Sequence, residues 1–258
     1  MSKIVLQGIL YDEKSSFLQG PALAPPLIRE AYHSNSANYY AENDIEVTPD
    51  SFMDMGDFSI KTYYEITTIT QKHLKNGCPV LTLGGDHSIT YPIVKAFHDQ
   101  LGPISILHID AHCDLYTDFE GDPFSHACPF YNIMSKNLAK DLTQVGIRTL
   151  NKEQRENGKK LGVNIVEMKA IDEFKMPAYD RPIYLSVDID ALDPAFAPGV
   201  SHHEPGGLTT RQLVQIIQDI PVPLLGADIV EYNPTRDING MTAMVCAKIL
   251  REISAKML

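Results

Sequence analysis

Short apolar segments rich in β-branched residues recur along this 258-residue chain, and stretches with the spacing of helices separate them. Six segments have the near-continuous hydrophobicity of strands buried on both faces: residues 4–6, 80–83, 104–109, 143–147, 183–189 and 224–230. The helical pattern is clearest in residues 209–220, where apolar residues recur at helical spacing behind Thr209, a suitable helix cap. This alternation predicts a three-layer α/β fold, in which helices cover both faces of a central parallel sheet.

The chain shows no repeats and no low-complexity segment, and its glycines and prolines are scattered rather than pooled into a linker. We therefore expect one domain over residues 1–258. Residues 34–57 are polar and weakly periodic. They read as a surface excursion with little chemical content.

The charge balance and the cysteines limit the possible partners and compartments. The 22 Lys and Arg residues against 33 Asp and Glu residues give a net charge of −11, which argues against nucleic acid as a partner. No apolar run approaches the ~18 residues of a membrane span, and the N-terminus does not read as a signal peptide. The four widely spaced cysteines form no CxxC pair. A reduced, cytoplasmic setting is expected.

Residues of the types that bind metal ions follow three of the predicted strands. In residues 83–88, paired glycines allow a sharp turn that presents His87 at the sheet edge. In residues 108–114, alternation along an extended strand would put Asp110, His112 and Asp114 on one side of the backbone.

The third strand end, residues 186–194, places Asp188 and Asp190 on one side of an otherwise apolar segment. Burying two like charges so close together is costly without a compensating cation. Over the three strand ends, four carboxylates balance the charge of two divalent ions. Ligation dominated by oxygen, with a minority of imidazole, favours Mn²⁺ over a structural Zn²⁺. We interpret Cys113 as a packing residue and His108 as a core residue or a partner of a ligand.

These residues resemble a known family signature. Gly-Gly-Asp-His-Ser, Asp-Ala-His-x-Asp and Ser-x-Asp-x-Asp-x-x-Asp-Pro, in this order, are similar to the motifs of the ureohydrolase family, which comprises arginase, agmatinase and relatives. Further similarity lies in residues 16–26, 119–127, 198–202 and 240–244, and covers nearly the whole chain. It is closer to the plant-type arginases than to the animal enzymes.

The resemblance implies an arginase-type fold with two Mn²⁺ ions, which hydrolyses a guanidino group to urea and an amine. One ion would be held by His87, Asp110, Asp114 and Asp188, and the other by Asp110, His112, Asp188 and Asp190. Asp110 and Asp188 would bridge the two ions, and Asp114 would serve catalysis as well as binding.

Two further residues occupy family positions with catalytic roles. His126 stands where the family keeps a proton-shuttling histidine, and Glu231 where it keeps a carboxylate for the guanidinium group. The resemblance also implies a homo-oligomer, a trimer or a hexamer. L-Arginine is the favoured substrate, with conversion to L-ornithine and urea, and agmatine or another guanidino compound is the alternative.

The sequence indicates less clearly which residues would bind the part of the substrate beyond the guanidino group. Where animal-type arginases carry a loop rich in Asn and Ser, this chain has acidic residues, among them Asp118 and Glu120. These could attract a cationic substrate tail or could form a solvated acidic loop. His202 and His203 could line the pocket or cap their loop.

Three other classes were weighed against this interpretation. A two-metal phosphohydrolase usually needs basic residues for phosphate, and only Arg148 and Arg236 lie near the motifs. A zinc deacetylase of the same fold would need one ion rather than ligands for two. The complete ligand set argues against a catalytically inactive scaffold.

Overall fold

A single sheet of eight parallel strands forms the centre of the structure, a computed structural model that describes residues 3–258. The strands lie in the order β2-β1-β3-β8-β7-β4-β5-β6. Their bounds are β1 Ile4–Leu10, β2 Phe52–Ser59, β3 Val80–Leu83, β4 Ile104–Ile109, β5 Ala139–Ile147, β6 Asn164–Glu167, β7 Ile183–Asp188 and β8 Leu224–Val230.

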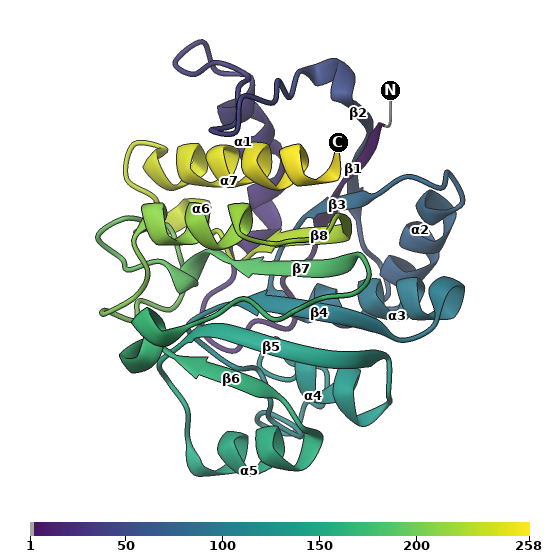
Figure 1. Ribbon diagram of the computed structural model, residues 1–258, viewed down its shortest axis with the longest axis vertical. Coiled ribbons are helices and arrows are strands. Elements are labelled where there is room, and N and C mark those ends of the chain that lie inside the picture. The colour runs from purple at the N-terminus through teal and green to yellow at the C-terminus, as the bar shows by residue number, and fades with distance from the viewer. Residues whose placement is uncertain (1–2) are drawn as a thin grey trace.

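Helices cover both faces of this sheet, as Figure 1 shows. One face carries α1 (Ala24–Tyr32), α6 (Thr210–Gln218) and α7 (Met241–Met257). The other carries α2 (Glu65–Leu74), α3 (Thr90–Leu101), α4 (Pro129–Ser135) and α5 (Lys152–Leu161). Short 3₁₀ turns lie at η1 Pro21–Leu23, η2 Pro49–Ser51, η3 His87–Ile89, η4 Met168–Glu173, η5 Ile189–Ala191 and η6 Pro234–Arg236. The predicted three-layer α/β fold is confirmed.

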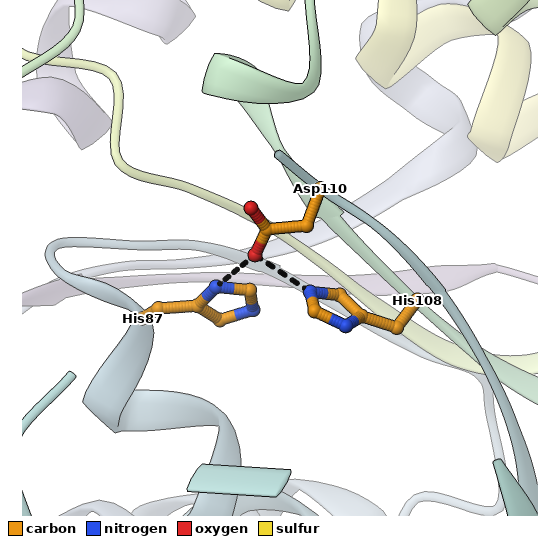
Figure 2. Close-up of side chains that lie close together, drawn as sticks. All are labelled: His87, His108 and Asp110. Carbon is orange, nitrogen blue, oxygen red and sulfur yellow. Dashed lines mark hydrogen bonds and ion pairs between the residues drawn. The ribbon is translucent and has the colours of Figure 1, made fainter. Parts of the chain in front are cut away.

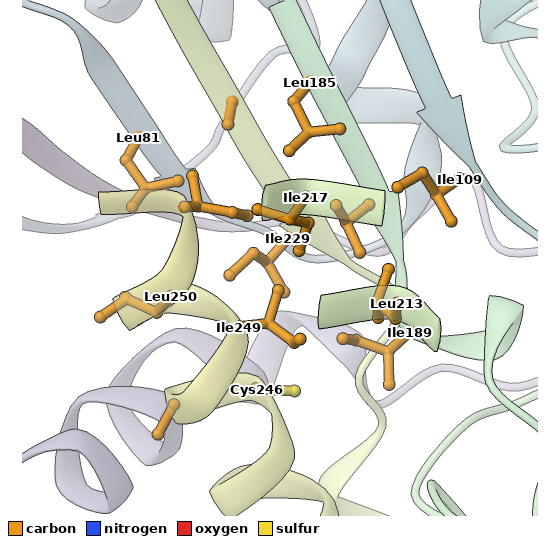
Figure 3. Close-up of a cluster of buried hydrophobic side chains, with 14 of the residues drawn as sticks. Leu81, Ile109, Leu185, Ile189, Leu213, Ile217, Ile229, Cys246, Ile249 and Leu250 are labelled. Carbon is orange, nitrogen blue, oxygen red and sulfur yellow. The ribbon is translucent and has the colours of Figure 1, made fainter. Parts of the chain in front are cut away.

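The two apolar cores lie between the sheet and its helices. In Figure 3, Leu185 and Ile229 of the sheet face Ile217 of α6 and Ile249 of α7. Burial of such side chains contributes about 1.5–3 kcal/mol each. The C-terminal helix α7 contacts both α1 and α6, so its apolar residues belong to this core.

All six predicted strands are present, but two further strands were not predicted. β2 falls partly within residues 34–57, so the interpretation of that segment as a surface excursion is wrong at its end. β2 and β6 are the two edge strands, and their residues are mostly half-buried or exposed. An edge strand lacks the two-sided burial that produces a continuous apolar run, so its residue pattern indicates a strand only weakly. At α6, Thr209 caps the helix as predicted and accepts a hydrogen bond from Gln212 N.

The order of the strands brings four carboxyl ends together at the middle of the sheet. Strands β3, β8, β7 and β4 are successive neighbours, and because all are parallel their carboxyl ends lie at one edge. Ligands bind at such edges in open α/β sheets. Within residues 3–258, no helix is both long and apolar enough to cross a membrane.

Candidate active site

Each of the four central strands ends at a residue of the site. His87 follows β3 and begins η3, Asp110 comes directly after β4, Asp188 is the last residue of β7, and Glu231 comes directly after β8. Glu231 has a φ of 62°, a left-handed conformation that is uncommon outside glycine and often occurs at functional sites.

His87 is held in the tautomer that a metal ligand requires. Its Nε2 donates a hydrogen bond to Ser186 Oγ (3.0 Å), which in turn donates to Asp228 (2.6 Å). The proton therefore resides on Nε2, and Nδ1 keeps its lone pair.

His87 Nδ1 is buried and has no hydrogen bond to any described residue, and it lies 3.1 Å from one carboxylate oxygen each of Asp110, Asp114 and Asp188. One imidazole lone pair and three carboxylate oxygens converge on one point. This donor set fits a divalent cation.

A second group of ligand atoms lies beside the first. His112 Nδ1 is 3.0 Å from Asp190 Oδ2 and 3.5 Å from Asp110 Oδ1. Asp110 thus offers Oδ2 to the first group and Oδ1 to the second, which is the geometry of a bridging carboxylate. The six predicted metal ligands are brought together in one cluster, and they form two adjacent groups.

The residues of this cluster are those predicted, but the backbone that carries them differs from the expectation. β4 ends at Ile109, so Asp110, His112 and Asp114 lie in a loop, and the expected strand alternation is wrong there. Asp114 reaches the cluster because its backbone turns, with a φ of 49°. Asp190 likewise lies in the 3₁₀ turn η5 rather than in a strand.

The cluster concentrates negative charge in a buried place. Burial, together with the charges of Asp190 and Asp110, raises the pKa of Asp188 well above its usual range. Burial opposes protonation of His112, but the adjacent carboxylates outweigh it and raise its pKa. Such crowding of like charges costs free energy, and two divalent cations would offset that cost.

His108 also lies in this region, as Figure 2 shows, with its ring and that of His87 both directed at Asp110 Oδ2. The His108 ring stacks on Phe130, with centroids 3.8 Å apart. Its Nε2 is 2.7 Å from Asp110 Oδ2, and its Nδ1 is 2.9 Å from Gln144 Nε2. Cys113 is fully buried in the apolar core, where we expected it to be a packing residue.

A cavity of about 210 Å³ opens above the cluster. Five of the predicted metal ligands line it, and His126 and Glu231 form part of its wall. Among the described residues that line it there is no lysine or arginine, whereas several are carboxylates. The cavity is therefore suited to a small cation.

Glu231 and His126 form a hydrogen-bonded pair in that wall. Glu231 Oε1 accepts hydrogen bonds from His87 N (2.9 Å) and from His126 Nδ1 (2.8 Å). Burial opposes protonation of His126, but the charge of Glu231 outweighs it and raises the pKa of His126 to about 9. Within residues 3–258 no hydrogen bond occupies Glu231 Oε2, which is left for a ligand in the cavity.

The other nitrogen of His126 contacts Ser16, a residue that sequence reasoning did not assign to the site. Ser16 N donates to His126 Nε2 (3.1 Å), and Ser16 Oγ is 2.7 Å from the same atom. Asp86, which follows the paired glycines, accepts from Lys14 N and so holds this N-terminal loop in place. The two residues are 110 positions apart, and nothing in the sequence around Ser16 predicts this contact.

Not all of the residues that were expected to bind the substrate tail line the cavity. His202 lines the cavity, with its ring centroid 5.5 Å from those of His112 and His126. Asp118 and Glu120 are exposed and do not line it, so that assignment is corrected.

The backbone explains this correction. Asp118 Oδ1 turns back to accept from Gly121 N, and Phe119, between the two acids, faces the cavity instead. His203 Nε2 lies 2.8 Å from Pro198 O and holds its own loop. The carboxylate that does line the rim is Glu204.

Arg148 links the rim to the metal cluster. Its guanidinium donates to the backbone oxygens of Glu204 (2.6 Å), Asp190 (2.8 Å) and Ala191 (3.1 Å). One half-buried side chain thus fixes both the turn that carries a metal ligand and the loop that carries a rim carboxylate.

Comparisons with known proteins agree with this geometry. The model of the arginase family matches residues 2–255. Arginase 1, mitochondrial, of Arabidopsis thaliana is 44% identical over 97% of this chain and 80% of its own length. An agmatinase of Bacillus anthracis is 32% identical over 98% of this chain and 91% of its own length. The solved structure of an arginase from Medicago truncatula superposes with a TM-score of 0.90 at 40% identity, over 99% of this chain and 87% of that one.

Proposed function

Because the chain belongs to the arginase family, we propose that it hydrolyses L-arginine to L-ornithine and urea with two Mn²⁺ ions. It is a ureohydrolase enzyme. The identity of the metal and of the substrate is our proposal. It is supported by the donor set of the site and by the similarity to plant proteins that bear the name arginase.

One observation carries the proposal. His87 Nδ1, buried and without a hydrogen bond to the described residues, lies 3.1 Å from three carboxylate oxygens, and His87 lines the same cavity as Glu231. Such an arrangement is costly without a cation, and the donor set favours oxygen-preferring Mn²⁺. The presence of ligands for a second ion at His112 separates the site from a one-ion deacetylase.

When bound, a pair of Mn²⁺ ions supplies a water molecule acidic enough to lose its proton near neutral pH. The first task of the chain itself is to hold the guanidinium carbon at a fixed place. Glu231 can do so, because Oε1 is fixed by His87 N and His126 Nδ1, and Oε2 faces the cavity. A charge-assisted hydrogen bond to a guanidinium is both strong and directional.

The second task is to protonate the leaving amine. In its neutral form, His126 carries a proton on Nδ1, toward Glu231, and Nε2 accepts from Ser16 N. Proton uptake at Nε2 would need only that Ser16 Oγ, 2.7 Å away, becomes the acceptor. His126 is therefore placed to exchange a proton through Nε2 without leaving Glu231.

The test is steady-state release of urea from arginine, agmatine, 4-guanidinobutanoate and guanidine, assayed side by side with Mn²⁺, together with a count of bound metal. We expect about two Mn²⁺ per chain, loss of hydrolysis on chelation, and the highest kcat/KM with arginine. One tightly held zinc ion and no response to manganese would refute the proposal.

Agmatine is a second candidate, and a specific observation favours it. The cavity lining includes no lysine or arginine that could pair with the α-carboxylate of arginine, whereas Glu204 could pair with a cationic tail. Relatives named agmatinase are also similar over most of the chain. Turnover of agmatine far above that of arginine would establish this alternative.

Location and assembly are further parts of the proposal. The four cysteines are free, which supports a reducing compartment and agrees with the cytoplasm, although the Arabidopsis relatives are named mitochondrial or chloroplastic. Imaging of the tagged protein would test this. Assembly into trimers or hexamers, without nucleic acid or membrane partners, rests on the family resemblance and on the acidic charge. Sedimentation analysis would test the assembly.

A further inference from the structure

A buried pair of polar side chains lies behind the metal cluster, on the side away from the cavity. His108 of β4 and Gln144 of β5 are register partners in the parallel sheet, and both are fully buried. Neither is needed to fill a ligand position, because the two metal groups are complete without them. Most polar side chains buried this deeply have at least one hydrogen-bond partner, and those partners fix their orientation.

The orientation of the Gln144 amide is determined by its neighbours. Its Nε2 donates to Cys113 O (2.7 Å), and a carbonyl oxygen can only accept. A flipped amide would place two acceptors against each other at this distance, so the second hydrogen on Nε2 points to His108 Nδ1 (2.9 Å). Gln144 Oε1 is left buried without a partner among the described residues.

This orientation settles the protonation of His108. Because Nδ1 accepts from Gln144, Nδ1 carries the lone pair, and the proton of the neutral ring is on Nε2. Nε2 then donates to Asp110 Oδ2 (2.7 Å), so both ring nitrogens are used. His108 is therefore not a metal ligand, although its ligand atoms lie within reach of those of His87 and Asp110 (Figure 2).

We propose that His108 and Gln144 act as a positioning pair, which holds the Asp110 carboxylate in the orientation that lets it bridge two metal ions. Oδ2 is fixed by His108 and lies 3.1 Å from His87 Nδ1, and Oδ1 is fixed by His112 N at 2.6 Å and faces the second group. Stacking on Phe130 keeps the His108 ring from rotating. This inference rests on the proposed two-metal function.

The prediction is a loss of metal affinity at both sites when the donor is removed. His108→Phe keeps an aromatic ring against Phe130 and removes the hydrogen bond to Asp110. It should weaken Mn²⁺ binding by roughly 10- to 100-fold, the usual effect of losing a residue that orients a ligand. His108→Gln, which can again present an N–H to Asp110, should restore most of the affinity. Gln144→Leu should also weaken binding, because the tautomer of His108 is then no longer fixed.

A matched control is available on β1, a strand that does not pair with β4. Gln7 is equally buried and donates from Nε2 to Thr70 Oγ1 (3.1 Å) and Thr82 Oγ1 (2.9 Å), away from the metal cluster. Gln7→Leu removes a comparable buried amide and should leave Mn²⁺ affinity unchanged. It therefore separates a positioning role from general damage to the core.

The measurement is titration of the metal-free proteins with Mn²⁺, with free Mn²⁺ followed by electron paramagnetic resonance. Weakening in His108→Phe and Gln144→Leu, recovery in His108→Gln and no change in Gln7→Leu would support the inference. Wild-type affinity in both His108→Phe and Gln144→Leu, or equal weakening in Gln7→Leu, would overturn it. Failure of the wild-type protein itself to bind two Mn²⁺ ions would instead overturn the proposed function on which it rests.

Discussion

Replacement of Arg148 by Met should destabilise the protein even when no metal is present. The guanidinium of Arg148 donates to three backbone oxygens within 3.1 Å, those of Glu204, Asp190 and Ala191, and it forms no ion pair with any described carboxylate. Methionine approximates the length of the stem and removes every donor. The three carbonyl groups then lose their partner, with only partial replacement by water.

The size of the effect follows from this count. A hydrogen bond from a charged donor contributes about 1.5–3 kcal/mol, and we take roughly 1–1.5 kcal/mol per bond because Arg148 is half-buried and water can reach part of the site. If one bond is counted for each of the three oxygens, the loss amounts to about 3–4.5 kcal/mol of unfolding free energy. For a chain of this size 1 kcal/mol shifts Tm by about 2 °C, so we expect a decrease of roughly 6–9 °C.

The assay is thermal unfolding by circular dichroism in the presence of a chelator, so that metal binding does not contribute. Arg155→Met is the control, because Arg155 is exposed and its two hydrogen bonds to Glu167 (both 2.8 Å) form a surface pair worth about 0–1 kcal/mol. Arg148→Lys, which keeps the charge but not the planar fork, should recover part of the loss. A Tm for Arg148→Met no lower than that of Arg155→Met would refute the reasoning.

Three further outcomes are expected. His126→Asn should lower kcat by roughly 10²- to 10⁴-fold and still bind two Mn²⁺, since His126 is not a ligand; loss of metal on analysis would contradict this. Asp188→Asn should weaken Mn²⁺ binding, measured by equilibrium dialysis, more than Asp190→Asn, because only Asp188 would serve both ions; equal weakening would count against the bridge. Glu204→Gln should shift the ratio of kcat/KM for arginine and agmatine several-fold, whereas Asp118→Asn should not change it. The opposite result would indicate that the acidic loop of Asp118, and not Glu204, contacts the substrate.

The central part of the fold was predictable because it follows from burial. Strands β3, β4, β7 and β8 are covered on both faces, so their sequences are mostly apolar. The edge strands β2 and β6 have no such run. These two strands form because they pair with β1 and β5, and the local pattern of apolar and polar residues does not predict that pairing.

The clustering of the six predicted metal ligands was predictable for a related reason. A carboxylate that follows a buried strand is itself buried, and several such carboxylates together need a cation. That argument requires only that the strand ends meet, and it holds although the alternation expected for Asp110, His112 and Asp114 is wrong. The left-handed φ of Asp114, which replaces that alternation, is a property of the folded loop that no residue pattern indicated.

At the rim of the cavity, charge alone does not determine which acidic residues line the cavity. Asp118 and Glu204 are both acidic and both lie in loops, but Asp118 turns away to accept from Gly121 N, whereas the segment of Glu204 is held over the cavity by Arg148. The difference arises from a backbone contact between positions 148 and 204. In the proposed function, the guanidino group that all the candidate substrates share would lie at the metal cluster. We therefore expect the side chains of this rim, and the contacts that fix its loop, to select among those substrates.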